Sequence, residues 1–129
     1  MIEPKWIEKD LVLTIHKMQI SRFGGLGGVR DVKLLEAALA RAKHYYAFYN
    51  DQNQIIPRLA CKYTVGIIQN HPFIDGNKRT GLILMHLFLR INDVKWVVSE
   101  EMQYIKVMAL ASNKISEDEF TDWALETFS

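Results

Sequence analysis

Hydrophobic residues recur along this chain at intervals of three and four, the spacing that places them on one face of an α-helix. The series that starts with Ile7 and Leu11 predicts an amphipathic helix over residues 7–21. Asp31 is a favourable N-cap, and the apolar face that follows it predicts a second helix extending at least to Ala42. The N-terminal third of the chain is therefore expected to form two helices.

Two segments in the middle of the chain are hydrophobic over much of their helical circumference. The first begins near Pro57, a residue that suits the first turn of a helix, and continues to Asn70. The second starts near Asn77 and ends near Asn92. Helices that are apolar on most sides are buried ones, so this pair is expected to form the core.

The C-terminal third combines one short β-prone run with two helix starts. Residues 96–98 (Trp-Val-Val) predict at most a single edge strand. Ser99, followed by two acidic residues, predicts the start of a helix, and Ser116 with Glu119 forms a capping box ahead of the last one. We therefore predict an all-α fold, a single domain over residues 1–129 built as a bundle of about six helices.

Composition narrows the functional classes. The chain has 129 residues, which suits one domain, and its formal net charge of +1 argues against a protein that coats nucleic acid. We therefore expect no direct contact with nucleic acid. Cys61 is the only cysteine, which excludes an internal disulfide and favours a reducing, cytoplasmic compartment. No signal peptide and no apolar run of about 18 residues is recognisable, so we expect no contact with a membrane either.

Two segments of unusual composition each allow two interpretations. Four of the seven glycines fall within Gly24–Gly28, which is either a plain connection between helices or a flap beside a functional site. The aromatic run Tyr45–Tyr49 either divides between core and surface or forms a docking surface for a partner. The sequence leaves both questions open.

The connection between the two core helices carries the residues with the clearest chemistry. His71 can accept a proton near neutral pH, and Asp75 is a hard oxygen ligand suited to Mg²⁺ bound together with phosphates. Gly76 permits a sharp turn into the next helix, whose free N–H groups attract anions. The segment therefore has the parts of a site for a phosphate-containing substrate.

Two cations at the start of that helix strengthen this interpretation. Lys78 and Arg79 stand where the helix dipole disfavours positive charge, at a cost of about 0.3–1 kcal/mol each. They are understandable if a polyphosphate lies over them, with Asn77 as a neutral donor or acceptor. The structural alternative is that His71 and Asp75 cap a turn while the cations point to solvent. The combination in one short segment favours the phosphate site.

The motif resembles that of a known family. Residues 71–80 (HPFIDGNKRT) are similar to the signature of the Fic superfamily and more closely to its Doc (death-on-curing) branch. Residues 20–26 (ISRFGGL) also resemble the N-terminal segment of Doc proteins. The resemblance covers nearly the whole chain and implies the Fic/Doc fold.

Two departures from the Fic signature bear on the reaction that the resemblance implies. Fic enzymes typically transfer AMP from ATP to a protein hydroxyl, using a glycine and a second arginine to hold phosphates. This chain has Lys78 and Leu82 at those positions, which would fill part of the pocket and remove a bidentate clamp. Doc proteins are understood to bind ATP in the opposite direction and deliver its γ-phosphate. A protein kinase is therefore favoured. An AMP transferase is the first alternative. A non-catalytic module that binds a nucleotide or a partner is the second alternative.

The resemblance also implies roles and partners. His71 would be the base, and Asp75, with Asn77 nearby, would hold Mg²⁺ on the phosphates of ATP. The expected catalytic residues are His71, Asp75, Asn77, Lys78 and Arg79, and those expected to bind the nucleotide are Gly76, Asn77, Lys78 and Arg79. The protein would be the toxin of a type II toxin-antitoxin system that phosphorylates elongation factor Tu on Ser or Thr and arrests translation. A cognate antitoxin would fold onto it in trans.

Residues near the motif are given structural roles. Phe73 is expected to be buried as the anchor of the motif segment. His16, His44 and His86 are expected to be packed or at the surface, without a role as ligands.

Overall fold

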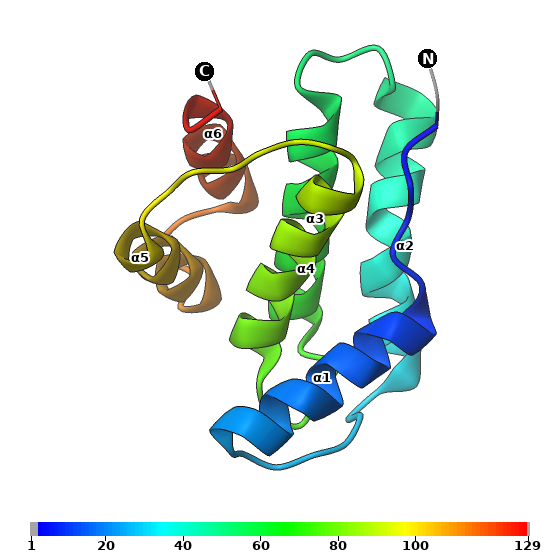
Figure 1. Cartoon of the computed structure of the whole chain (residues 1–129), viewed down its shortest axis with the longest axis vertical. Helices are drawn as coiled ribbons and strands as arrows, with labels where there is room; N and C mark the ends of the chain where they lie inside the picture. The colour runs from blue at the N-terminus through cyan, green and yellow to red at the C-terminus, as the bar shows by residue number, and fades with distance from the viewer. Residues whose placement is uncertain (1–2, 129) are drawn as a thin grey trace.

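The computed structural model describes residues 3–128, which form six α-helices and no β-strand (Figure 1). The helices are α1 (Lys9–Phe23), α2 (Val32–Tyr49), α3 (Ile55–Asn70), α4 (Asn77–Ile91), α5 (Glu100–Ala111) and α6 (Glu117–Glu126). The predicted all-α fold of about six helices is confirmed. Within the described residues, no helix combines the length and the hydrophobicity needed to cross a bilayer.

The two predicted core helices, α3 and α4, run antiparallel through the centre of the molecule (Figure 1). α2 packs along α3, α1 crosses the end at which α4 begins, and α5 and α6 lie on the opposite side from α2. Gly66 lets α3 approach α2 closely, because a methyl group on it would lie 2.9 Å from the Ala38 carbonyl oxygen. The core is formed by fully buried side chains of these helices, among them Leu35, Leu59, Tyr63, Ile67, Leu84 and Phe88.

Local capping explains why three of the six described helices begin where the sequence predicts. The Asp31 carboxylate accepts the Leu34 N–H at 3.0 Å, and Ser99 caps α5 in the same way. Ser116 and Glu119 form the predicted capping box of α6. The first helix begins at Lys9 rather than at residue 7, and the Ile7 N–H before it donates to the Tyr63 hydroxyl at 3.2 Å.

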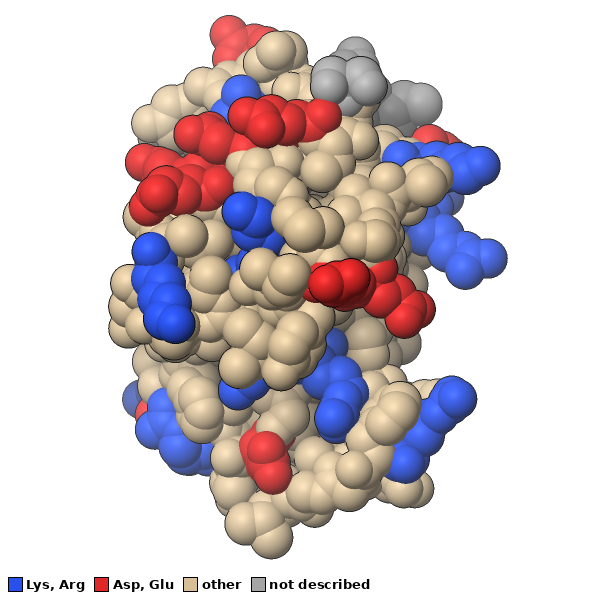
Figure 2. All heavy atoms as spheres, turned by 90° about the vertical axis from the view of Figure 1, so that its left-hand side faces the viewer, with Lys and Arg blue, Asp and Glu red and all other residues tan. Residues whose placement is uncertain are grey.

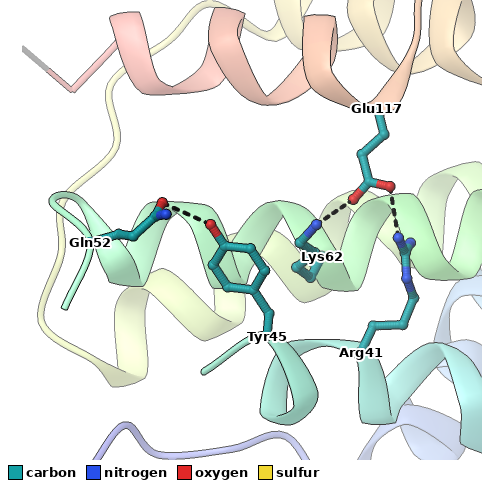
Figure 3. Close-up of polar contacts among 5 residues, drawn as sticks. All are labelled: Arg41, Tyr45, Gln52, Lys62 and Glu117. Atoms are coloured by element: carbon teal, nitrogen blue, oxygen red, sulfur yellow. Dashed lines mark hydrogen bonds and ion pairs between the residues drawn. The ribbon is translucent and has the colours of Figure 1, made fainter. Parts of the chain in front are cut away.

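An ion-pair cluster attaches α6 to the core. The Glu117 carboxylate accepts bonds from Arg41 of α2 at 2.7 Å and from Lys62 of α3 at 2.8 Å (Figure 3). Beside it, the Tyr45 hydroxyl donates to Gln52 at 2.9 Å. Tyr45 and Tyr46 of the aromatic run are partly buried, whereas Phe48 and Tyr49 are exposed, which agrees with a division between core and surface.

The expected edge strand at residues 96–98 is wrong. This segment belongs to the extended connection between α4 and α5, and the helical bundle offers it no strand with which to pair. The Trp96 ring packs 5.9 Å from that of Phe128, and its N–H donates to Thr127 at 2.6 Å. Val97, which contributed to the β-prone pattern, is 76% exposed. Packing of Trp96 and a bond from the Gln103 side chain to the Val98 carbonyl at 2.9 Å, rather than strand pairing, hold the segment.

Candidate active site

The motif loop, which we define as residues 71–76, joins α3 to α4 and is anchored from within. Phe73 is fully buried, as the sequence predicts. The Asn77 side chain accepts the Phe73 N–H at 3.1 Å and donates to the Phe73 carbonyl at 2.9 Å. With both polar atoms engaged and only 5% of its surface exposed, Asn77 holds the loop together. Its expected contact with metal or nucleotide stays a prediction.

His71 ends α3 in a left-handed backbone conformation, with φ of 50°, and its side chain is exposed. Its carbonyl accepts a bond from Arg30 Nε at 2.8 Å, and the same guanidinium donates to the Asn70 carbonyl at 3.0 Å. Arg30 therefore caps the C-terminal end of α3 and fixes the backbone that carries the imidazole. The backbone that carries the expected base is thus held in place, and its side chain is open to solvent.

Asp75 lies at the other end of the motif loop with an exposed carboxylate. Oδ1 accepts the Gly76 N–H at 2.8 Å and Oδ2 accepts the Leu26 N–H at 3.3 Å. These two bonds, with the nearby charges of Lys78 and Arg79, lower the pKa of Asp75 below its ordinary value. An ionised carboxylate suits a hard cation such as Mg²⁺.

The surroundings of Asp75 limit how a metal could be held. Within residues 3–128, no three His, Cys, Asp or Glu side chains are grouped so that they could hold a metal ion. Mg²⁺ usually binds through one or two carboxylates together with substrate phosphates, so a single carboxylate fits that mode.

The glycine loop, residues 24–28, lies against the motif loop. The Ile74 N–H donates to the Gly28 carbonyl at 3.2 Å, and a single β-bridge pairs Val29 with Phe73. A methyl group on Gly25 would lie 2.8 Å from Asp75 Oδ2, so the loop touches the carboxylate as closely as its backbone allows. The loop is more than a connection between helices, while a part in catalysis stays a prediction.

The start of α4 presents concentrated positive charge. Gly76 adopts φ of 78° and places no side chain over the helix end, and the first helical bond runs from the Thr80 N–H to its carbonyl. The N–H groups of the three residues before Thr80 are therefore directed outward at the positive end of the helix. Lys78 and Arg79 are both exposed there, and the Arg79 guanidinium lies 4.5 Å over the Phe23 ring.

A cleft of about 740 Å³ opens beside this helix start, between α1, the glycine loop and α5. Its lining includes Asp75, Gly76, Asn77, Lys78 and Arg79 at one end and Leu82, Ile83, Tyr104, Val107 and Met108 along its walls. Figure 2 views the molecule from the side of α5, and blue Lys and Arg side chains predominate in its lower half, toward α1 and the start of α4. A charged end and largely apolar walls, which also carry His86, Glu100 and Gln103, suit an organic ligand that has both phosphates and an apolar part.

The structure brings together five of the six expected site residues around the cleft. His71 is the exception, since it stands at the opposite end of the motif loop and does not line the cavity. Leu82, where the Fic signature has an arginine, is a wall of the cleft. A substrate that used the whole site would therefore extend from the cleft along the motif loop toward His71.

The other histidines behave as the sequence predicts. His16 is buried, and His44 and His86 are exposed. His86 Nε2 lies 2.6 Å from the Gln103 side-chain oxygen, a contact that joins α4 to α5 at the edge of the cleft.

Comparisons with known proteins show the family to which this chain belongs. The sequence model of the Fic/DOC family matches residues 6–89. The chain is 33% identical over 116 residues to the "Protein kinase doc" of Escherichia phage P1, with 90% of each chain covered. It is 35% identical over 94 residues to the "Toxin Doc" of Mycolicibacterium smegmatis, covering 70% of this chain and 67% of that protein. The chain belongs to the Fic/DOC family.

Proposed function

We propose that this protein is a Doc-type toxin that transfers the γ-phosphoryl group of ATP to a Ser or Thr hydroxyl of another protein. One observation carries the proposal: the uncapped, cationic start of α4 opens into a cleft beside an ionised carboxylate. The names and family of the relatives support it, since one is a protein kinase and another a toxin. Phosphoryl transfer needs positioning and neutralisation of charge more than covalent chemistry, and this small site offers both.

His71 is the proposed base. Its imidazole is exposed at the end of α3, on a backbone held by Arg30, so an acceptor hydroxyl on a protein surface can reach it. It would remove the hydroxyl proton as the oxygen attacks the γ-phosphorus, and the ADP oxygen leaves on the opposite side.

The start of α4 is the proposed phosphate site. The outward N–H groups, with Lys78 and Arg79, would bind the phosphate oxygens and stabilise the charge that builds up on them. Asp75 would hold Mg²⁺, which when bound supplies charge neutralisation on the phosphates. The hydrogen bonds to both oxygens of Asp75 keep that carboxylate oriented before substrate arrives.

The identity of the residues in the cleft favours phosphoryl over AMP transfer. Lys78 replaces a glycine and Leu82 an arginine of the Fic signature, and both side chains line the cavity. An AMP transferase remains the alternative, because the family includes such enzymes. The two activities differ in which phosphorus of ATP reaches the acceptor.

The acceptor we propose is a translation factor, elongation factor Tu, whose phosphorylation would arrest translation in the cytoplasm. Control would come from a cognate antitoxin that folds onto the protein in trans. These proposals rest on membership of the family and on the Doc proteins among the relatives.

The test uses purified protein, purified elongation factor Tu and ATP labelled at the γ position. Wild type is expected to label the factor, and His71→Ala to lose at least about 100-fold in rate because the base is gone. His44→Ala, another exposed histidine far along the sequence from the motif, is the matched control and should keep wild-type activity. Equal labelling by wild type and His71→Ala would contradict the assigned base, and binding of ATP without transfer would support the binding module instead.

A further inference from the structure

His16 of α1 lies directly beneath the motif loop. Its side chain is 3% exposed, and its ring stacks on that of Phe73 with centroids 3.8 Å apart and planes only 7° from parallel. The stacking brings α1 against the anchor of the motif loop. None of the roles described above uses this histidine.

The polar edge of the same ring reaches the residue that is proposed to bind metal. His16 Nε2 lies 2.8 Å from the Asp75 carbonyl oxygen. A carbonyl oxygen only accepts hydrogen bonds, so Nε2 carries the proton and donates it. The ring also lies next to Gly76, since a methyl group on that glycine would be 3.6 Å from Nε2.

With this contact, both the backbone and the side chain of Asp75 are held by hydrogen bonds. The carbonyl is held from below by His16, while the carboxylate is held by the N–H groups of Leu26 and Gly76. Gly76 is also the N-cap of α4, so the same turn sets the direction of the helix start. A shift of the Asp75 peptide would therefore move the metal-binding carboxylate and the phosphate-binding N–H groups relative to each other.

We propose that His16 is a positioning residue for phosphoryl transfer, acting through its Nε2 donor to the Asp75 carbonyl. This inference rests on the proposed function. Its buried, doubly engaged ring fixes the motif loop at the point where two parts of the site meet. Misplacement of a catalytic group by about 1 Å can cost about 100-fold in rate, which is the size of effect expected here.

Three variants distinguish the role of the Nε2 hydrogen bond from the role of the stacked ring. His16→Gln keeps an amide N–H at about the reach of Nε2, whereas His16→Asn is one methylene shorter and places its donor nearer the position of Nδ1. His16→Phe keeps the stacking on Phe73 and removes the donor. We expect His16→Gln to keep kcat within about tenfold of wild type, and the other two to lose about 100-fold with a raised Mg²⁺ requirement. In His16→Phe, which keeps the stacking on Phe73, KM for the acceptor protein should be unchanged, because Arg30 still holds the backbone of His71.

A second readout does not depend on activity. Amide hydrogen exchange at Leu26 and Gly76, whose N–H groups bind the Asp75 carboxylate, should be about tenfold faster in His16→Asn and His16→Phe than in wild type or His16→Gln. Thermal unfolding measured on all variants accounts for general destabilisation, which should affect His16→Gln and His16→Asn alike.

The two readouts separate the two claims. If the exchange pattern holds while wild type transfers no phosphate, the positioning of the loop stands and the proposed kinase activity fails. If His16→Asn and His16→Phe match wild type in kcat and in amide exchange, the role of the Nε2 donor is overturned. The same holds if kcat of His16→Gln is reduced as much as that of His16→Asn.

Discussion

Gly25 has almost no space for a side chain beside Asp75. Its φ of +115° is strained for any other residue, and a methyl group there would lie 2.8 Å from Asp75 Oδ2. We therefore expect Gly25→Ala to displace the carboxylate and lower the rate of phosphate transfer by about tenfold or more. Gly27 is the matched control, because a methyl group on it meets nothing within 4 Å. Transfer at the wild-type rate by Gly25→Ala would contradict the close approach of the glycine loop.

Single residues also show which parts of the site a sequence can reveal. The motif residues are consecutive along the chain, so their combined chemistry is visible without a structure. Arg30 and His16 are not, because they reach the motif loop from 41 and 59 residues away. The sequence predicts ligand binding for Asn77, which stays a prediction, but it does not reveal that the amide also holds the Phe73 backbone. Residue types indicate which chemistry is possible, whereas hydrogen-bond partners can be identified only from the folded structure.

At the scale of elements, Glu117 ties α6 to α2 and α3. Burial by itself raises the pKa of the Glu117 carboxyl, but the bonds from Lys62 and Arg41 outweigh it and leave the pKa below its ordinary value. The stabilisation is therefore present above the unfolded-state pKa of 4.5 and is lost as the pH falls through the lower folded-state pKa. We expect Glu117→Gln to reduce the free energy of unfolding at pH 7 by about 1–2 kcal/mol.

Chemical denaturation across pH checks this expectation. The gap between wild type and Glu117→Gln should shrink below about pH 4.5, where the carboxyl takes up a proton in the unfolded chain before it does so in the folded protein. Asp122→Asn, an exposed acidic residue of the same helix, should have little effect at any pH. A gap that stays constant down to pH 2 would contradict the role of the charged cluster.

Elements differ in how far local sequence determines them. Asp31, Ser99 and Ser116 cap their helices through side chains only three residues from the bonded N–H, so these starts were predictable. The β-prone run at residues 96–98 was misassigned because β-propensity reflects a sheet surface to pack on, which this bundle lacks. The structure replaces it with packing of Trp96 on side chains of the C-terminal helix region.

At the scale of the whole molecule, Cys61 reports on the integrity of the bundle. It lies fully buried in α3, and burial raises the pKa of its thiol to about 12. The folded protein should therefore react with a thiol reagent such as iodoacetamide only through opening of the core. We expect labelling at neutral pH to be at least about 1000-fold slower than for the unfolded chain and to accelerate across the unfolding transition in urea. Native labelling as fast as that of a free thiol would contradict a tightly packed core.

The net charge of the whole molecule does not reveal the local positive charge at the site. A net charge of +1 describes an average, whereas on the face in Figure 2 Lys and Arg side chains predominate in the lower half, near the start of α4. That local concentration of positive charge supports the proposed binding of phosphates at the start of α4.

Transfer from ATP carrying different labels at its α and γ positions tests the central claim most directly. Both labels are followed in one reaction of the wild-type protein with purified elongation factor Tu, with His71→Ala alongside. The proposed phosphoryl transfer predicts γ label on the factor, no α label, and loss of the γ label with His71→Ala. Appearance of the α label on the factor would contradict the account and identify the protein as an AMP transferase.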